Sequence, residues 1–274
     1  MTVSVAEQHA AARERVRTRE DLAAMTGSTR VMTRADAVAI SHFRQAQYRR
    51  SPDLTLADES VLLWDGQDDR SVVLAVRAHD GAILGTMRAE PLSDAQGASR
   101  ALDCPVPIRD PVFPAMLLGR AATRADCQKL GLNSLMRFHF LRFARERGIR
   151  HVYGRVYGEA ARTHLMRSIG YNFLPHPKGA AMSAGTAGVH SSLYVAVLDL
   201  ETHGDDALRT LEGRVADLLA RFPLMESLES ENFTAGDAGL ARFLRDLFNK
   251  ATLAAGGEHG AAGAPGPAEA LRAA

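Results

Sequence analysis

The residues best suited to chemistry lie between Leu117 and Asn133. The apolar run from Leu117 to Thr123 is followed by a turn that opens a long amphipathic segment, with the residues Gln128, Lys129, Leu130, Gly131, Leu132 and Asn133. A strand that enters a helix through a tight glycine turn leaves several backbone N–H groups without partners, and the helix dipole adds positive charge at the same point. This arrangement favours the binding of a phosphate group.

The elements expected around this turn belong to the α+β class. Helices are indicated where apolar residues recur at helical spacing, at 34–50, 54–63, 130–147 and 160–168. Strands are indicated by short apolar runs between turn signals, at 72–76, 83–88, 115–123, 152–156, 171–174 and 193–200. The first two strands are separated by His79-Asp80-Gly81 and predict a β-hairpin. The order of the elements predicts a mixed, mostly antiparallel sheet flanked by helices.

Composition divides the chain into four segments. Residues 1–30 are rich in Ala and Arg and predict a helical extension, and residues 31–202 hold the α+β domain. Residues 203–253 predict a second helical extension, with helices at 206–222 and 237–250. The Ala-, Gly- and Pro-rich tail, 254–274, buries too little apolar surface to offset the entropy of ordering, so we expect it to be disordered.

The composition also excludes several classes of protein. The 274 residues carry 33 Lys+Arg and 32 Asp+Glu, so no overall field would hold the protein on nucleic acid or an anionic membrane. Only Cys104 and Cys127 are present, and neither a CxxC nor an HExxH spacing occurs, so we expect neither a disulfide framework nor a metal site. No run approaches the ~20 apolar residues that a membrane helix needs. The sequence predicts a cytoplasmic protein with no transmembrane segment and no nucleic-acid partner.

Gln128, Gly131 and Asn133 occupy the marked positions of the loop pattern Gln/Arg-x-x-Gly-x-Gly/Ala. On this motif and on the order of its elements, the sequence resembles the GNAT acyltransferase superfamily. The resemblance implies a GNAT fold, and it implies that residues 128–133 grip the pyrophosphate of coenzyme A or the phosphate of phosphopantetheine. It also implies that the strand edge hydrogen-bonds the pantetheine arm through Ala121, Ala122 and Thr123. Asn133 departs from the pattern, which has a small residue there.

Three further stretches resemble the autoinducer-synthase-like branch of that superfamily, which includes the FeeM-type N-acyl amino acid synthases. They are Phe43 to Tyr48, Leu84 to Pro91 and Leu118 to Ala122. This resemblance, which spans 32–200, implies acyl carrier protein as a partner that delivers the acyl chain. It implies an acceptor side lined by Arg44, Asp58, Arg88 and Arg120.

Arg88 and Arg120 have separate expected roles on that side. We expect Arg88 to bind the carboxylate of an amino-acid acceptor, because the planar guanidinium fork matches a carboxylate. We expect Arg120 to lie deeper and to be held by Asp58 or Glu90.

Both residues that usually transfer protons in the resembling enzymes are replaced here. Leu117 stands where the branch has a glutamate that acts as base on the acceptor amine. Met166 stands where many GNAT enzymes have a tyrosine that protonates the leaving thiolate. Glu90, Glu159 and His164 are the substitute bases, and we favour Glu90, at the end of the second hairpin strand. His164 is expected on a helix surface.

Positive charge near the 128–133 loop bears on the identity of the acyl donor. Arg124 and Lys129 lie where an acidic carrier protein would dock or where coenzyme A would place its phosphates, and both sources stay open. The arginines of the long helix and just beyond it are expected mostly on a solvated face: Arg137, Arg142, Arg145, Arg147 and Arg150. Cys127 is expected to be a small hydrophobic side chain, with an acyl-thiol intermediate as the minor alternative.

These observations predict an N-acyltransferase. It moves a medium or long acyl chain from a phosphopantetheine thioester, on acyl carrier protein or coenzyme A, to the amine of a small molecule such as an amino acid. Glu90 and Arg120 are its expected catalytic residues, and acyl-phosphopantetheine is a co-substrate rather than a permanently bound cofactor. The alternatives are an acetyl-coenzyme-A-dependent N-acetyltransferase and a module that binds acyl thioesters without turnover. The sequence predicts no oligomeric state.

Overall fold

The computed structural model describes residues 27–50, 62–78, 80–157, 162–178 and 193–221. Its strands are β1 (Gly27–Met32), β2 (Val72–Ala78), β3 (Ile83–Leu92), β4 (Ala115–Thr123), β5 (His151–Tyr157), β6 (Asn172–Pro175) and β7 (Leu193–Asp199). Its helices are α2 (Ala37–Tyr48), α3 (Gly66–Asp69), α4 (Ala95–Leu102), α5 (Leu132–Glu146), α6 (Arg162–Ser168) and α8 (Leu200–Arg221), with 3-10 turns η1 (Arg34–Asp36) and η3 (Ala125–Cys127).

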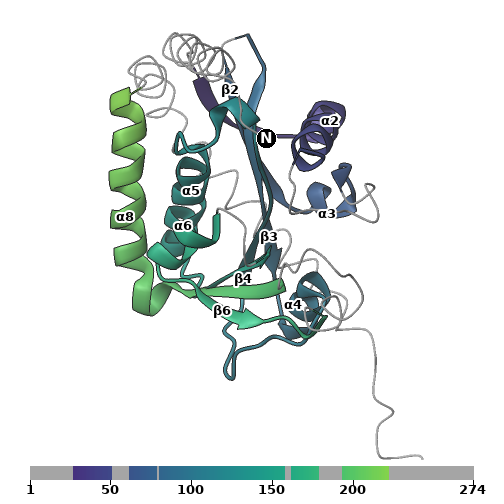
Figure 1. The fold of residues 1–274 in the computed structure, drawn as a ribbon. Coiled ribbons are helices and arrows are strands. Elements are labelled where there is room, and N and C mark those ends of the chain that lie inside the picture. The colour runs from purple at the N-terminus through teal and green to yellow at the C-terminus, as the bar shows by residue number, and fades with distance from the viewer. Residues whose placement is uncertain (1–26, 51–61, 79, 158–161, 179–192, 222–274) are drawn as a thin grey trace, which may run out of the picture.

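The strands form one sheet in the order β1-β2-β3-β4-β5-β7-β6 (Figure 1). Neighbouring strands run antiparallel, except that β4 and β5 are parallel. The α+β class and the mixed, mostly antiparallel sheet predicted from the sequence are therefore confirmed. The predicted hairpin of β2 and β3 is present, and Gly81 supplies the positive φ, +86°, that its turn requires.

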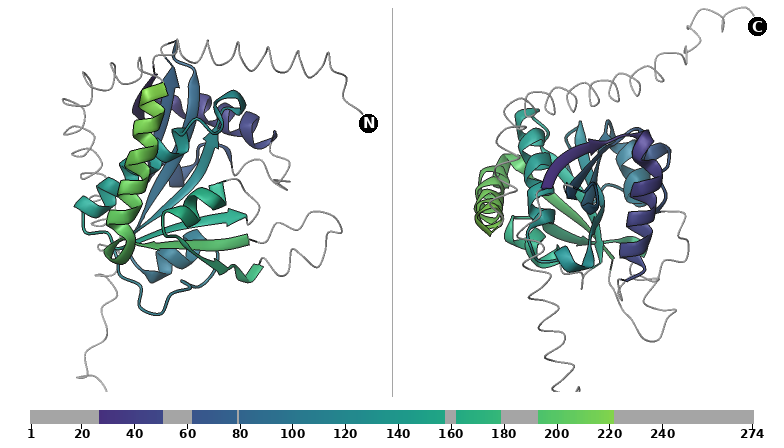
Figure 2. Two further views of the ribbon diagram at one scale, coloured as in Figure 1. Left: turned by 60° about the vertical axis from the view of Figure 1, so that its left-hand side comes forward. Right: turned by 90° about the horizontal axis from the view of Figure 1, so that it is seen from above.

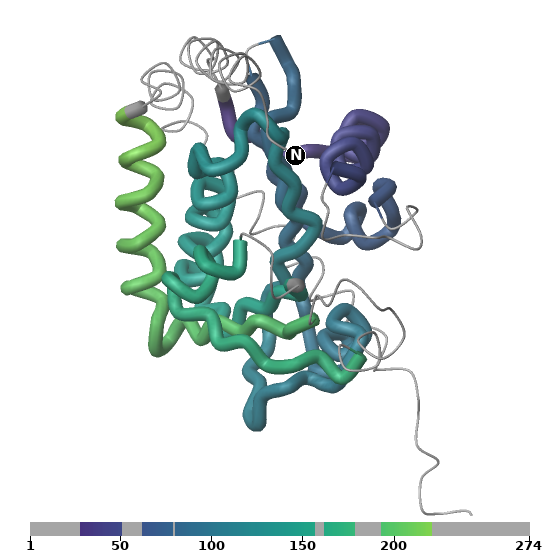
Figure 3. The backbone as a smooth tube through the Cα atoms, viewed as in Figure 1, coloured from purple at the N-terminus to yellow at the C-terminus, as the bar shows by residue number. Residues whose placement is uncertain are grey.

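Helices cover both faces of this sheet. α5, α6 and α8 lie on one face, and α2, α3 and α4 lie on the other (Figures 1 and 2). α8 packs beside α5, as the Cα tube shows (Figure 3). The sheet therefore separates two sides of the molecule, here called the α5 side and the α2 side.

Each side of the sheet has its own apolar core. On the α5 side, Leu135, Met136 and Phe140 are at most 1% exposed, and burial of each such side chain contributes about 1.5–3 kcal/mol. On the α2 side, one cluster lies under α4 and contains Leu117 and Tyr153. A second cluster on this side lies under α2 and contains Ile40. Because side chains alternate along a strand, a residue two positions from a member of one core faces the same side of the sheet.

The structure differs from the sequence prediction at several boundaries. Gly27 and Ser28 pair with Ala78 and Arg77 as the start of an edge strand, so the sheet begins inside the segment predicted as a helical extension. α8 begins at Leu200 rather than at 206, because it follows β7 directly. α3 and α4 were not predicted. Four predicted segments lie outside the described residues: residues 1–26 of the helical extension, most of the helix at 54–63, the helix at 237–250, and the tail at 254–274.

Candidate active site

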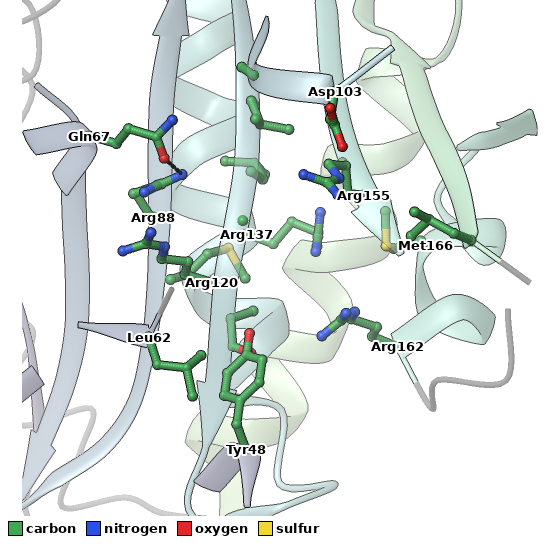
Figure 4. Close-up of a pocket in the computed structure, with 18 of the residues that line it drawn as sticks. Tyr48, Leu62, Gln67, Arg88, Asp103, Arg120, Arg137, Arg155, Arg162 and Met166 are labelled. Carbon is green, nitrogen blue, oxygen red and sulfur yellow. Dashed lines mark hydrogen bonds between the residues drawn. The ribbon is translucent and has the colours of Figure 1, made fainter. Parts of the chain in front are cut away.

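The strands β4 and β5 part from each other in the middle of the sheet. They pair from Met116 to Leu118 on β4, against Val152 to Gly154 on β5, and not beyond. A cavity of about 460 Å³ lies at this opening (Figure 4). Its walls come from both sides of the sheet, with Leu118 and Met166 from the core of the α5 side and Leu117 from that of the α2 side. Such a cavity can receive one substrate from each side.

β4 carries a bulge at the opening. Thr86 pairs with Ala122 and Arg88 with Gly119, so that two β4 residues, Arg120 and Ala121, face a single β3 residue. Arg120 adopts φ +49°, a conformation that L-residues rarely hold without a functional or structural constraint. The bulge takes backbone groups of both residues out of the regular ladder, and both residues line the cavity. Backbone N–H groups freed in this way can polarise a carbonyl oxygen.

The end of α2 holds this bulge in place. The Tyr48 hydroxyl donates a hydrogen bond of 3.2 Å to the Ala121 carbonyl. Arg44 lies one helical turn earlier and therefore on the same face of α2. Its side chain is fully buried and forms two hydrogen bonds, of 2.9 and 3.0 Å, with the Asp68 carboxylate. α2 thus contributes one residue to the bulge and another to the charged cluster beside it.

Three arginines and three carboxylates form that cluster on the α2 side. Arg120 bonds Asp68 and Asp65 at 2.6 Å each, and it also donates to the Leu63 carbonyl at 2.9 Å. Arg88 bonds Glu90 at 3.0 Å and lies 3.7–3.9 Å from the two aspartates. α3 orients both aspartates. The Asp65 carboxylate caps its N-terminus, and the Asp68 carboxylate accepts a hydrogen bond from the backbone N–H of Asp65. The members are Arg44, Arg88, Arg120, Asp65, Asp68 and Glu90.

This cluster changes the expected roles of its arginines. Arg120 is held by Asp65 and Asp68 rather than by Asp58 or Glu90, and Asp58 lies outside the described residues. Arg120 is also not the deeper of the pair, because its side chain is 14% exposed and that of Arg88 is 7% exposed. Both line the cavity, whereas Arg44 does not, so Arg44 positions Asp68 and does not reach a substrate. The acidic partners were missed because an aspartate pair in a four-residue helix has no periodicity.

Glu90 does not line the cavity, although Arg88, to which it bonds, does. In the β3–β4 register it stands directly opposite Leu117, which does line the cavity. Burial raises the pKa of Glu90 above its usual range, and the nearby Arg88 opposes this shift only in part. A carboxylate with a raised pKa accepts a proton more readily near neutral pH.

The predicted phosphate loop stands at the start of α5, outside the cavity wall. No side chain caps this helix, so its first N–H groups are not satisfied by a side-chain cap. Lys129 and Gly131 have positive φ values, of 65° and 103°. Leu132 is buried, so at that position the backbone and not the side chain would face a donor. α8 packs against one side of the loop, because a Cβ at Gly131 would lie 3.5 Å from Leu218.

The minor candidates do not reach the cavity. Cys127 is 1% exposed, and burial raises the pKa of its thiol to about 11, which opposes an acyl-thiol role. His164 is exposed on α6, as expected from the sequence, and Glu159 lies outside the described residues. Arg124 pairs with Asp126 at 2.6 Å. Within the described ranges, no cluster of metal-ligating side chains occurs, and no helix is long and apolar enough to cross a membrane.

Four more arginines line the cavity and were not predicted to do so: Arg100, Arg137, Arg155 and Arg162. Arg155 follows Tyr153 by two residues on β5 and therefore faces the α2 side. Within the described part of the chain, Arg100, Arg155 and Arg162 form no ion pair. Asp103 is the carboxylate of the cavity wall, and Lys178 binds it at 2.6 Å. Among the described residues that line the cavity, arginines therefore outnumber carboxylates.

No protein-family model matches the sequence, and no curated protein is similar to it. Solved structures with a similar chain include the N-acetyltransferase from Staphylococcus aureus Mu50, at 10% identity and a TM-score of 0.42, over 64% of this chain and 99% of that one. The ribosomal-protein-S18-alanine N-acetyltransferase from Escherichia coli is 16% identical, with a TM-score of 0.42, over 64% and 94%. The GNAT domain of PAT from S. lividans is 20% identical, with a TM-score of 0.39, over 64% and 90%.

The fold is of the GNAT type. The order of the sheet, its single parallel pair and the bulged β4 at the opening carry this assignment. The similarities to solved structures have TM-scores under 0.5, so no argument rests on them. Because one fold can host many activities, the function must be argued from the cavity and the residues around it.

Proposed function

We propose that the protein is an N-acyltransferase. It transfers a medium or long acyl chain from a phosphopantetheine thioester, on acyl carrier protein or coenzyme A, to the amine of a small molecule such as an amino acid. The observation that carries this proposal is the cavity at the β4–β5 opening beside the bulge of Arg120 and Ala121. The thioester enters from the α5 side, where the start of α5 offers uncapped N–H groups to a phosphate. The amine enters from the α2 side.

Each charge that develops during the proposed reaction has a group of this chain beside it. The amine attacks the thioester carbonyl, whose oxygen becomes negative and is stabilised by N–H groups of the bulge. Glu90, which bonds Arg88 and does not itself line the cavity, takes the proton that the amine loses through one bridging water, helped by its raised pKa. The thiolate then leaves. Arg88 and Arg120 keep the α2 wall ordered, since their bonds to Glu90, Asp65 and Asp68 fix both side chains.

An amino-acid acceptor needs a cation that is free to bind its carboxylate. Arg88, the expected partner, already bonds Glu90 at 3.0 Å. Arg155 lies on the same side of the sheet and has no ion pair within the described residues, so we assign the carboxylate to Arg155. Arg100 of α4 adds positive charge to the same end of the cavity.

Mass spectrometry of lipid extracts tests this function in cells. Cells that overproduce the wild type should contain a new N-acyl species, and its mass names the acceptor and the chain length together. A Glu90→Gln variant at equal expression is the matched control and should give far less of it. An N-acetylated product alone would favour the acetyl-coenzyme-A alternative, which the arginine-rich cavity wall would suit. No new species, with tight binding of acyl thioesters in vitro, would indicate a module without turnover.

A further inference from the structure

Arg137 is a buried cation at the β4–β5 opening. It is 3% exposed, yet it lines the cavity on the α5 side together with Met166 (Figure 4). The sequence predicted a solvated face for most of the arginines on and just beyond this helix, and Arg137 is an exception. It precedes Phe140 by three residues and Leu141 by four, and both are fully buried.

Among the described residues, the guanidinium of Arg137 has no anionic partner. Nη1 donates a hydrogen bond of 3.0 Å to the Tyr171 hydroxyl, and the guanidinium lies 5.4 Å from the centre of the Tyr171 ring. Nε is buried without a hydrogen-bond partner, and no carboxylate within the described ranges forms an ion pair with this side chain. Arg88 and Arg120 line the same cavity, but each of them is paired with a carboxylate.

A buried guanidinium without an anion is costly, and the cost falls when a negative charge arrives beside it. Tyr171 holds the orientation of Arg137 but supplies no charge, because burial raises the pKa of its hydroxyl. Since the described residues offer Arg137 no anion, a negative charge that forms within the cavity or enters it would find an unpaired guanidinium there. Met166, on the same wall, stands where the resembling enzymes have the tyrosine that protonates the leaving thiolate, and methionine has no proton to give.

We propose that Arg137 pairs with the thiolate that leaves during acyl transfer, an inference that rests on the proposed function. The amine nitrogen forms a bond to the carbonyl carbon, the C–S bond breaks, and its electron pair stays on sulfur. The proton lost by the amine goes to Glu90. The guanidinium keeps its own protons, since arginine is not deprotonated in proteins, and stabilises the sulfur anion by charge. The thiolate is protonated by solvent after release.

The test compares the binding of two products that differ in one atom. The thiol product is coenzyme A or holo acyl carrier protein, whichever donor the wild type turns over, and its partner is the desulfo analogue, which lacks the sulfur. Inhibition constants of both are measured at one fixed, mildly alkaline pH for the wild type, Arg137→Met and Arg137→Lys. Arg142→Gln, a charge removal on the same helix outside the cavity wall, is the matched control. Both constants come from one preparation, so a smaller folded fraction cancels in their ratio.

At a pH about one unit above the pKa of the bound thiol, the wild type is expected to bind the thiol product about 10-fold more tightly than the desulfo analogue, because only the thiol product can present an anion to Arg137. Arg137→Met should bind both about equally, whereas Arg137→Lys and Arg142→Gln should keep the preference. A wild-type preference that persists in Arg137→Met, or a wild type that shows none, would overturn the inference while leaving the acyltransferase activity in place. A wild type that turns over no acyl thioester would overturn the proposed function, and this inference with it.

Discussion

Glu90 and Leu117 lie directly opposite each other on β3 and β4. Leu117 occupies the place of the glutamate base in the resembling enzymes, and the Cβ atoms of such a cross-strand pair lie about 4.5–5.5 Å apart. Glu90 therefore places a carboxylate on the same side of the sheet as Leu117, one strand away. This relationship is the main structural support for Glu90 as the base.

Glu90→Gln should abolish most of the activity. We expect kcat to fall on the order of 10²–10⁴-fold, the usual contribution of a general base, with the donor KM little changed. Because burial raises the pKa of Glu90, its ionised form is lost at a higher pH than that of an ordinary carboxyl group, so the acidic limb of the wild-type kcat profile should be displaced upward. The limb should be missing from the variant. A variant with wild-type kcat and the same limb would show that the base is elsewhere.

Moving the carboxylate across the strand pair should restore part of the lost rate. The double variant Glu90→Leu, Leu117→Glu places a glutamate on the cavity wall and a leucine behind it. We expect its kcat to exceed that of Glu90→Leu alone, because the base again lies on the α2 side of the opening. Steady-state kinetics of the two variants, with circular dichroism as the folding control, makes the comparison. Equal rates would show that a carboxylate at position 117 cannot replace Glu90 as the base.

Arg44→Leu should destabilise the fold without a specific effect on substrate binding. Arg44 and Asp68 are both fully buried, and removal of one partner of a buried pair costs about 3–5 kcal/mol. We expect a loss near the lower end, since Asp68 keeps its bond to Arg120. Arg34→Leu is the control, because it breaks an exposed pair with Asp69 and should cost less than about 1 kcal/mol. Urea unfolding measures both, and equal losses would contradict the role given to Arg44.

Arg155→Gln should affect one substrate only. A charge-assisted hydrogen bond contributes about 1.5–3 kcal/mol, so the KM for an amino-acid acceptor should rise about 10-fold to 100-fold. The KM for the corresponding amino-acid amide, which lacks the carboxylate, should change little, as should the donor KM. Arg88→Lys is the comparison, and we expect it to disturb kcat through Glu90 rather than this selectivity. Selectivity lost in Arg88→Lys and kept in Arg155→Gln would return the carboxylate to Arg88.

The parts predicted well are those with strong local patterns. The β2–β3 hairpin and β4 follow from apolar runs with clear turn signals, and α5 follows from the spacing of Leu135, Met136 and Phe140. The parts missed depend on tertiary contacts. Asp65 and Asp68 acquire their roles when Arg44 and Arg120 converge on them from distant positions. The parting of β4 from β5, which makes the cavity, is a property of the strand pairing and has no local signature.

One site residue could have been found from the sequence. Arg137 lies on the same helical stripe as Phe140 and Leu141, and this spacing is that of a buried position, although the sequence analysis grouped it with exposed arginines. A run of arginines along a helix is typical of a solvent-exposed face, but one of these arginines, Arg137, faces the core. The position of a charge relative to the apolar stripe is therefore more informative than the number of charges.

The most direct measurement is acyl transfer by the purified protein. The wild type is mixed with decanoyl acyl carrier protein, decanoyl coenzyme A or acetyl coenzyme A and a panel of amino acids with their amides, and the products are identified by mass spectrometry. The account predicts an N-decanoyl amino acid from at least one decanoyl donor, formed faster than any N-acetyl product. Transfer of acetyl groups alone, or no N-acyl product with any donor, would contradict it.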